Sequence, residues 1–367
     1  MKIVMKNRPG RLSAVALLIL VHAAVIPHAQ AFQPAPIPIR VVVVTTFENG
    51  QDTGDAPGEF QNWVERYPLT ATLPFPQGYH PLRYNQADHV LGIVTGVGKS
   101  HAAASIMALG MDPRFDLTRA YWILAGIAGI DPARGSVGSA AWASYAVDGD
   151  LGYEIDSREI PPDWPTGIVP YDRATPYQQP VPAIHSDWAD QLFHLNEGLT
   201  GWAYQLTADM HLPDDATLKA VRAGYPTYPN AQKPPFVLRG DTITADRFWL
   251  GSRMVEWSQK WVTYWTRGKG IAVTSAEEDT GYLQALTLLS HAKRVDFDRV
   301  MDLRTASDYE LPPQGKDAVQ LLASEAHDTL SGYKEALESA YLVGSRVVKE
   351  LAQHWERYAD QVPGARR

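Results

Sequence analysis

The segment Arg40-Val-Val-Val-Val-Thr-Thr46 contains four consecutive valines followed by two threonines, all of them β-branched. β-Branched side chains lose rotamer freedom in a helix and fit the pleated surface of a strand. A strand that is apolar on both faces is typical of the centre of a parallel sheet covered by helices on each side. The segment therefore predicts a central strand of an α/β fold.

Strands and helices are expected to alternate along the rest of the chain. Apolar runs predict strands at residues 89–95, 119–125, 139–147, 270–274 and 297–303. Helical periodicity predicts helices at residues 99–109, 184–197, 247–266, 279–293 and 333–358. This alternation favours an α/β fold with a mostly parallel sheet. Because no linker marks a domain boundary, residues 32–367 are predicted to form a single domain.

The first 31 residues have the order of features found in a secretory signal peptide. Four cationic side chains precede an apolar run at residues 12–26, and Ala29-Gln30-Ala31 has the small-x-small pattern of a signal-peptidase site. The apolar run of 15 residues is shorter than the roughly 20 needed to span a bilayer. We therefore predict that residues 1–31 are removed and that the mature chain is periplasmic or secreted, the alternative being a retained N-terminal anchor. No later segment is long and apolar enough to span a membrane.

The composition excludes several classes of function. The chain has no cysteine, which excludes disulfides, thiolate metal sites and cysteine nucleophiles. Its formal net charge of −8 does not favour nucleic acid or an anionic membrane as a partner. The histidines are scattered without metal-ligand spacing, so neither a metal nor another cofactor is expected. No G-x-S-x-G elbow indicates a serine hydrolase.

Acidic residues follow two of the apolar runs. They occur in Thr274-Ser-Ala-Glu-Glu-Asp-Thr-Gly281 and in Val300-Met-Asp-Leu-Arg-Thr-Ala-Ser-Asp308. In an open α/β sheet, ligands bind at the carboxyl ends of the strands. Two acidic strand ends therefore indicate an enzyme that transfers protons and binds hydroxyl groups, with a sugar as the first expectation for its substrate.

A glycine turn lies between the second predicted strand and the helix that follows it. Thr95-Gly-Val-Gly-Lys-Ser100 resembles part of a P-loop, but Ile93 stands where the P-loop requires its first glycine. We therefore do not expect a nucleoside triphosphatase. The backbone N–H groups near Gly96 and Gly98 are able to bind an anion or a water molecule, and the alternative is a tight turn with no ligand.

Four segments, in this order, resemble those of the nucleoside phosphorylase and nucleosidase superfamily. Val94-Thr-Gly-Val-Gly-Lys-Ser-His-Ala-Ala-Ala104 resembles its first glycine turn and helix, and Leu124-Ala-Gly-Ile-Ala-Gly-Ile-Asp-Pro132 resembles its second glycine-rich loop. Glu277-Glu278-Asp279 resembles its Met-Glu-Gly segment. Arg304-Thr-Ala-Ser-Asp308 resembles its Arg-x-x-Ser-Asp segment.

Within this superfamily the chain is most similar to the purine nucleoside permeases. The similarity covers residues 39–358 and includes Phe47-Glu48, Phe115-Asp-Leu-Thr118, Tyr153-Glu-Ile-Asp156, Trp164-Pro-Thr-Gly167 and Glu278-Asp279. The resemblance implies a three-layer α/β/α sandwich around a mixed, mostly parallel twisted sheet of nucleoside phosphorylase type. It also implies a purine nucleoside as substrate and a homo-oligomer. Since the mature chain has no predicted span, transport would require a separate uptake carrier.

The resemblance assigns Asp308 as the general acid that protonates the departing base, with Ser307 orienting it. The alternative for this pair is a turn cap. Glu278 is expected to accept hydrogen bonds from both ribose hydroxyls, because a carboxylate offers paired acceptors. The alternative is an acid that favours the dipole of the helix that follows. Glu277 replaces the methionine that this superfamily often has. The predicted substrate-binding set also includes Arg304, Gly96, Gly98, Gly126 and Gly129.

The general base that activates water is predicted to be Glu48, which follows the first strand, with Glu59 as the second choice. The alternative for Glu48 is a solvated acid of the loop. Phe47 and Phe248 are predicted to contact the nucleobase or the sugar of the substrate, and the alternative is packing in the core. Phosphorylases of this superfamily bind phosphate at positions that align with Leu124 and Ile127, and neither side chain can do so.

We therefore expect a nucleoside N-ribosyl hydrolase that acts on exported or extracellular purine nucleosides in support of uptake. The alternatives are a purine nucleoside phosphorylase and a non-catalytic nucleoside-binding protein.

Overall fold

Strand β2 (Val41–Thr45) lies at the centre of the main sheet in the computed structural model, which describes residues 35–183, 191–325 and 331–364. It pairs in parallel with β5 (Val90–Val94) on one side and with β7 (Tyr121–Ile130) on the other. Every residue of β2 is buried. The central parallel strand predicted from the valine run is therefore confirmed.

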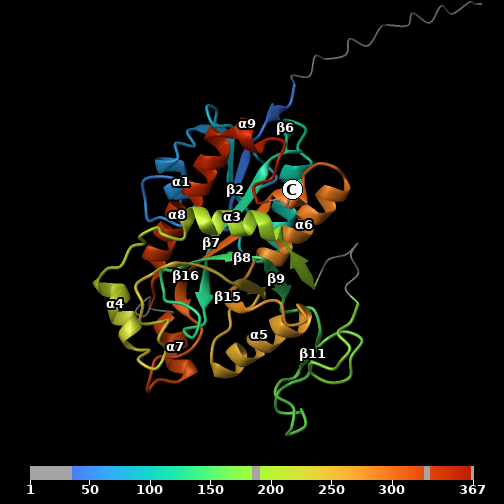
Figure 1. The fold of residues 1–367 in the computed structure, drawn as a ribbon, viewed down its shortest axis with the longest axis vertical. Coiled ribbons are helices and arrows are strands. Elements are labelled where there is room, and N and C mark those ends of the chain that lie inside the picture. The colour runs from blue at the N-terminus through green and yellow to red at the C-terminus, as the bar shows by residue number, and fades with distance from the viewer. Residues whose placement is uncertain (1–34, 184–190, 326–330, 365–367) are drawn as a thin grey trace, which may run out of the picture. The chain divides into compact units, whose positions relative to one another are not determined.

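Helices cover both faces of this sheet. Val41 and Val43 pack toward α1 (Gln61–Arg66), α3 (Glu197–Thr207) and α8 (Tyr333–Gln353), whereas Val42 and Val44 pack toward α2 (Lys99–Gly110) and α6 (Asp279–His291). Figure 1 shows α1 and α8 on one side of the strands and α6 on the other. Successive side chains of a strand point to opposite faces, so the valine run supplies both cores. The predicted three-layer α/β/α arrangement is confirmed.

The sheet is mixed. Its main path runs in the order β12 (Leu192–His194), β9 (Tyr145–Asp148), β14 (Asp241–Thr244), β15 (Ala272–Ala276), β7, β2, β5, β4 (Leu82–Asn85), β3 (Ala71–Leu73). Outside this path, β16 (Val300–Tyr309) pairs with β7 in parallel and with β8 (Ala140–Ala143) antiparallel, and β13 (Val237–Arg239) pairs with β8 in parallel. Antiparallel pairs occur at the β3–β4–β5 edge, between β12 and β9, and between β15 and β7.

Five stretches of strand close into a ring. Only Ser144 separates β8 from β9, and only Gly240 separates β13 from β14. The pairings then run from β7 to β16, to β8–β9, to β13–β14, to β15 and back to β7. This closure brings the carboxyl ends of β7, β15 and β16 together, so residues far apart in the sequence become neighbours there.

The remaining elements surround this framework. They are α4 (Ala216–Ala223), α5 (Ser252–Trp265), α7 (Ala318–Glu325), α9 (Trp355–Tyr358), the 3₁₀ helix η1 (Phe297–Arg299), and two small sheets, β1 (Ile37–Pro38) with β6 (Phe115–Asp116) and β10 (Tyr153–Glu154) with β11 (Ile168–Val169). All of them belong to one compact unit, Pro36–Arg367. The predicted signal peptide lies outside the described residues. Among the described helices, none is long and apolar enough to cross a membrane.

Several predicted bounds differ from the structure. The helix predicted at 247–266 begins only at Ser252, and the strand predicted at 297–303 begins only at Val300, after η1. Of the helix predicted at 184–197, residues 184–190 lie outside the described residues, and β12 occupies 192–194. Helix α3 begins only at Glu197, because the side chain of Asn196 accepts hydrogen bonds from the N–H groups of Gly198 and Leu199 and caps it. The helix predicted at 333–358 ends at Gln353, and His354 separates it from α9.

Candidate active site

A cavity of about 210 Å³ lies where β7, β15 and β16 meet. Its lining comprises Thr46, Phe47, Glu59, Val97, Ile127, Ala128, Gly129, Phe248, Ser275, Ala276, Glu277, Glu278, Ser307 and Asp308. Eight of these were predicted from the sequence as site residues: Phe47, Glu59, Gly129, Phe248, Glu277, Glu278, Ser307 and Asp308. The ring of strands thus brings most of the predicted set into one place.

A bulge in β16 presents Ser307 and Asp308 together. Ala306 is paired with Ala128 and Asp308 with Gly129, so Ser307 is an extra residue with no opposite residue in the register of β7. Such bulges redirect side chains at the ends of strands. Because both residues lie inside β16, the alternative that they cap a turn is wrong.

Ser307 Oγ donates a hydrogen bond of 2.7 Å to Asp308 Oδ1. Burial raises the pKa of the Asp308 carboxyl, and the hydrogen bond from Ser307 opposes part of that rise. A buried carboxyl of this kind retains its proton to higher pH than an exposed aspartate does.

Of the two acids predicted as the base, only Glu59 lines the cavity. Its Oε1 accepts from the N–H of Ile127 (2.7 Å), and its Oε2 accepts from the N–H and the hydroxyl of Thr46 (2.7 Å each). Burial raises the pKa of Glu59 to about 7; Arg304 lowers it and Glu278 raises it further. A carboxyl with this pKa changes its charge near neutral pH.

Glu48 has a different environment. Its carboxylate accepts hydrogen bonds from the backbone N–H groups of Asn49, Gly58, Phe60 and Gln61. Phe60 and Gln61 stand at the start of α1, where N–H groups have no partner within the helix. Glu48 therefore closes the loop at 49–58 against the helix end, and it does not line the cavity.

Glu278 is held from two sides. Its Oε1 accepts from the N–H of Gly98 (3.2 Å), and its Oε2 accepts from Nη2 of Arg304 (3.0 Å). Burial raises the pKa of Glu278, while Arg304 opposes that rise. The carboxylate thus has a fixed orientation at the wall of the cavity.

Arg304 lies behind the cavity rather than in its lining. The guanidinium is fully buried and contacts Glu278, Asp279 and Asp302 through ion pairs. Gly126 permits this arrangement, because a Cβ there would lie 2.6 Å from Nη1 of Arg304. Neither Arg304 nor Gly126 faces the cavity, and both support the acids that do.

Glu277 also lines the cavity, and its carboxyl is half-buried. Burial raises the pKa of Glu277 to about 7, and the neighbouring charge of Glu278 raises it further. Phe248 has 53% of its surface exposed at the cavity, and Phe47 is half-buried with its ring 6.2 Å from that of Tyr333. Both rings are thus accessible to a ligand rather than packed in the core.

The glycine turn is already occupied by protein carboxylates. The N–H of Gly98 donates to Glu278, and the N–H of Lys99 donates to Asp246 Oδ1 at 2.8 Å. The ammonium of Lys99 contacts Asp148 and Asp150 instead of the cavity. Gly96 and Gly98 adopt positive φ angles of 88° and 92°, which L residues rarely adopt, and neither lines the cavity.

No lysine, arginine or histidine occurs among the described residues that line the cavity. Leu124 is buried in the core between the sheet and helices α2 and α6, and Ile127 presents an apolar side chain to the cavity. The described lining is therefore rich in carboxyl groups and presents none of the cationic side chains that usually bind phosphate.

Sequence reasoning did not identify Ser275 or Glu310. Ser275 lines the cavity, and Glu310 is buried two residues beyond Asp308. The two-residue period of a strand places residues 308 and 310 on one face, which was the available signal for Glu310. No comparable signal pointed to Ser275, because the pairing of β15 with β7 is not visible in the sequence.

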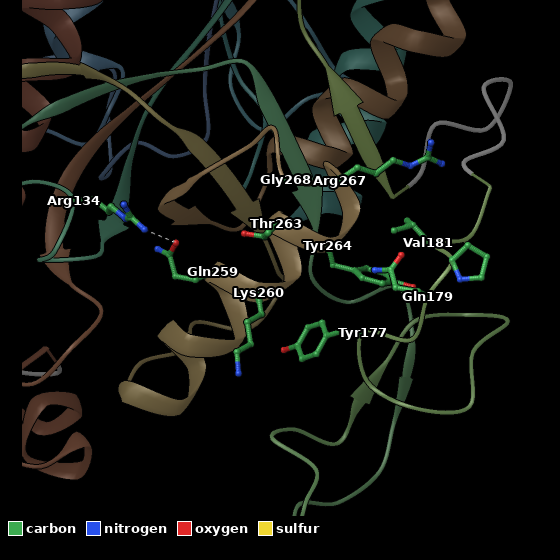
Figure 2. Close-up of a pocket in the computed structure, with 11 residues that line it drawn as sticks. Arg134, Tyr177, Gln179, Val181, Gln259, Lys260, Thr263, Tyr264, Arg267 and Gly268 are labelled. Atoms are coloured by element: carbon green, nitrogen blue, oxygen red, sulfur yellow. Dashed lines mark hydrogen bonds between the residues drawn. The ribbon is translucent and has the colours of Figure 1, made fainter.

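A second cavity, of about 980 Å³, lies beside α5 and contains none of the predicted residues. Figure 2 shows Arg134, Lys260 and Arg267 around it, with Arg134 hydrogen-bonded to Gln259. None of the described residues that line this cavity carries a carboxylate. The described lining therefore offers none of the carboxyl groups that the sequence predicts for the site.

Comparison with known proteins places the chain in a family. A family model described as purine nucleoside permease matches residues 38–363. The chain belongs to the purine nucleoside permease family. Family members include a purine nucleoside permease of Candida albicans, 30% identical over 90% of this chain and 80% of the relative. A probable purine nucleoside permease of Schizosaccharomyces pombe is 31% identical over 76% of this chain and 80% of the relative.

Two solved nucleosidase structures are similar to this permease-family chain. A 5′-methylthioadenosine/S-adenosyl homocysteine nucleosidase of Helicobacter pylori gives a TM-score of 0.49 at 12% identity, covering 85% of this chain and 98% of that chain. A Streptococcus pneumoniae MTA/SAH nucleosidase gives 0.49 at 13% identity, covering 85% and 99%. The family predicted from the sequence motifs is confirmed by the family model and the relatives.

Proposed function

We propose that the protein hydrolyses the N-glycosidic bond of purine nucleosides. The observation that carries the proposal is one cavity lined by the carboxyls of Glu59, Glu278 and Asp308, with no cation among its described lining residues. The names of the relatives supply the substrate class, a purine nucleoside. This reaction needs three groups. They are a general acid that protonates the departing purine, an acceptor for the ribose hydroxyls, and a general base that accepts a proton from water.

Asp308 is the general acid in this proposal. It donates its proton to a ring nitrogen of the purine as the C1′–N9 bond breaks, and the electron pair of that bond leaves with the base. Burial favours the protonated carboxyl, which supports this role. The sugar carbon acquires positive character in this step, and the surrounding carboxylates stabilise that charge.

Glu59 is the general base. It accepts a proton from a water molecule while the water oxygen forms a bond to C1′, which gives free ribose. Both oxygens of Glu59 are held by Thr46 and Ile127, so the carboxylate has a fixed orientation. After the reaction Glu59 carries a proton and Asp308 lacks one, and exchange with solvent restores both.

Glu278 binds the ribose hydroxyls. Gly98 and Arg304 engage one lone pair on each of its oxygens, and each oxygen keeps a second lone pair for a hydroxyl donor. Arg304 helps to keep Glu278 ionised, which a hydroxyl-accepting group requires.

Water is favoured over phosphate as the nucleophile. The carboxylates of Glu278 and Asp246 occupy the N–H groups of the glycine turn, and Ile127 is apolar. A phosphate dianion in this cavity would meet several carboxylates and no cationic side chain among the described lining residues. We therefore infer hydrolysis rather than phosphorolysis.

The family name favours a second candidate, a nucleoside-binding protein that serves uptake without catalysis. In either case we propose a periplasmic or secreted protein that supplies nucleoside, or the base released from it, to a separate carrier.

The test is the Asp308→Asn variant. It should lower the rate of base release from purine nucleosides by about 10²–10⁴-fold, because the amide cannot donate a carboxyl proton. Asp298→Asn is the matched control, since Asp298 is an exposed aspartate of η1 outside the cavity. Full turnover by Asp308→Asn would show that this carboxyl is not the acid. Saturable binding of nucleoside without base release by the wild type would favour the binding protein.

A further inference from the structure

The cavity of about 980 Å³ beside α5, called the α5 cavity below, has no role in the proposed hydrolysis. One side of α5 and the turn that follows it form one wall, which comprises Gln259, Lys260, Thr263, Tyr264, Arg267 and Gly268. Residues 177 and 179–181 form the facing wall (Figure 2). A cavity of this size is large enough for a small-molecule ligand.

The α5 cavity is positively charged, although the formal net charge of the chain is −8. Arg134, Lys260 and Arg267 line it, and no aspartate or glutamate does so among the described residues. Two acids outside the lining lie near these cations: Glu256 is 2.7 Å from Nζ of Lys260, and Asp131 is 3.9 Å from Nε of Arg134. Arg267 has no ion pair among the described residues. The described groups therefore leave an excess of positive charge at this cavity.

Gln259 holds Arg134 at the wall. Its Oε1 accepts a hydrogen bond of 3.1 Å from Nη2 of Arg134, which Figure 2 marks with a dashed line. Its Nε2 donates to Asp131 Oδ2 (2.9 Å) and to the carbonyl of Ala272 (2.8 Å). The side chain of Arg134 is still 42% exposed, so other N–H groups of the guanidinium are available to a ligand.

The hydroxyl of Tyr177 is buried and has no hydrogen-bond partner among the described residues. The ring is held by edge contacts with Trp261 and Tyr264, at centroid distances of 6.4 and 6.1 Å. Figure 2 shows the hydroxyl directed to the side of the cavity where Lys260 lies. Because buried polar groups are nearly always paired, this hydroxyl indicates a place for an oxygen of a ligand.

The helix itself explains only part of this arrangement. The dipole of α5 favours a cation after its last turn, which accounts for Arg267, and an i,i+4 ion pair accounts for Lys260. Neither effect keeps carboxylates out of the lining or leaves the hydroxyl of Tyr177 unpaired. Lys260 and Arg267 are also about 10 Å apart along the helix axis, at 1.5 Å per residue. A ligand that contacts both cations therefore needs more than one acidic group.

We propose that the α5 cavity is a second ligand site, which binds a small molecule that carries two or more phosphate or carboxylate groups. Lys260 and Arg267 contact separate acidic groups of this ligand, and Arg134 donates its exposed N–H groups. Tyr177 donates its hydroxyl to the group that Lys260 binds. The carboxyl-lined cavity would repel such a ligand, and binding at the α5 cavity is independent of the proposed hydrolysis.

The experiment titrates tripolyphosphate, and separately citrate, into the full chain and measures the heat of binding. We expect saturable binding of one molecule per chain, which weakens as the salt concentration is raised because exposed charges are screened. Saturation by tripolyphosphate alone would identify phosphate groups on the ligand, and saturation by citrate alone would identify carboxylates. Absence of saturable binding for both probes would overturn the proposal.

Arg267→Gln and Lys260→Gln should each weaken binding by about two- to fivefold, the range for exposed ion pairs. Lys293→Gln is the control for Arg267, because Lys293 is also exposed after the last turn of a helix, with a φ of 56° against 54°. Arg346→Gln is the control for Lys260, because Arg346 is equally exposed and also has a glutamate four residues away. An equal loss in Arg267→Gln and Lys293→Gln would overturn the proposal, since the probe would then respond to overall charge.

Two further variants exclude loss of binding through misfolding. Tyr177→Phe keeps the ring and should weaken binding by about three- to tenfold, the effect of one hydrogen bond, with an unchanged urea midpoint. Glu256→Gln should strengthen binding by about two- to fivefold, because it removes the carboxylate that competes for Lys260, and a misfolded protein would not bind more tightly. Wild-type affinity in Tyr177→Phe, or weaker binding in Glu256→Gln, would contradict the proposed site.

Discussion

Glu59 has a carboxyl whose ionisation controls activity near neutral pH in this account. Burial raises its pKa to about 7, and a general base must be ionised to accept a proton. Asp308 must be protonated at the same time, and burial raises the pKa of that carboxyl as well. The pH range in which both groups have the required charge is therefore limited on its acidic side by Glu59.

We predict that kcat/KM for inosine rises with pH through about 7 as Glu59 loses its proton. Glu59→Gln should lower kcat/KM by about 10²–10⁴-fold and abolish the rising limb. Glu48→Gln is the matched control, because Glu48 contacts only backbone N–H groups of its own loop and of α1 among the described contacts. The measurement is a pH–rate profile of each variant. A rising limb retained in Glu59→Gln and lost in Glu48→Gln would reverse the assignment.

These two glutamates show what a sequence reveals about a site and what it does not. Ser307, Asp308 and Glu278 were found by their motifs, since each lies next to a strand or inside one. The choice between Glu48 and Glu59 depends on how the loop at 49–58 folds back, and spacing does not determine that. The structure uses Glu48 to cap α1 and places Glu59 at the cavity.

At the scale of elements, the position of α2 against α6 fixes the glycine turn beside Glu278. Gly281 in the first turn of α6 lies directly against the backbone of Lys99. A Cβ at position 281 would overlap the carbonyl oxygen, the carbonyl carbon and the Cα of Lys99, and backbone atoms cannot rotate away as a side chain does. The two helices are therefore close because residue 281 has no side chain.

We predict that Gly281→Ala lowers the free energy of unfolding by about 1–3 kcal/mol, the usual cost of overpacking. Gly201→Ala is the control: it lies in α3 with nothing within 4 Å of the added Cβ, and alanine should raise the free energy of unfolding there by about 0.5–1 kcal/mol. Urea unfolding of both variants provides the measurement. A Gly281→Ala protein as stable as the wild type would show that α2 and α6 are not in contact at this position.

The elements also differ in how far the sequence predicts them. Strands that are apolar on both faces, such as β2, β5 and β7, were found because burial on both sides leaves a continuous apolar run. The helix predicted at 184–197 is wrong over residues 192–194, which form β12, because a short periodic stretch is ambiguous and the cap at Asn196 was not recognised. The ring formed by β7, β16, β8–β9, β13–β14 and β15 was not predicted, because it rests on pairings between distant segments.

For the whole molecule, the buried carboxyls make stability depend on pH in a defined direction. The pKa of Glu59 is raised to about 7 in the folded chain from an ordinary value of 4.5, and burial also raises the pKa values of Glu278, Asp302, Asp308 and Glu310. A carboxyl whose folded pKa exceeds its unfolded pKa contributes stability that is fully present below the unfolded value and is lost as pH rises through the folded value.

We therefore predict that the midpoint of thermal unfolding falls as pH is raised from about 5 to 8. Below pH 4 a second loss is expected, because the pKa values of Asp112, Asp116, Glu197 and Glu256 are lowered in the folded chain. Scanning calorimetry across this range is the measurement, with Glu59→Gln expected to show a weaker dependence. A midpoint that stays constant or rises between pH 5 and 8 would contradict the raised pKa values of these buried carboxyls.

The most direct measurement incubates the protein with inosine, with and without phosphate, and quantifies hypoxanthine, free ribose and ribose 1-phosphate. This account predicts hypoxanthine and free ribose in equal amounts at a rate that phosphate does not change. Ribose 1-phosphate formed only in the presence of phosphate would contradict it, because the carboxyl-lined cavity would then bind the dianion that its charges are expected to exclude.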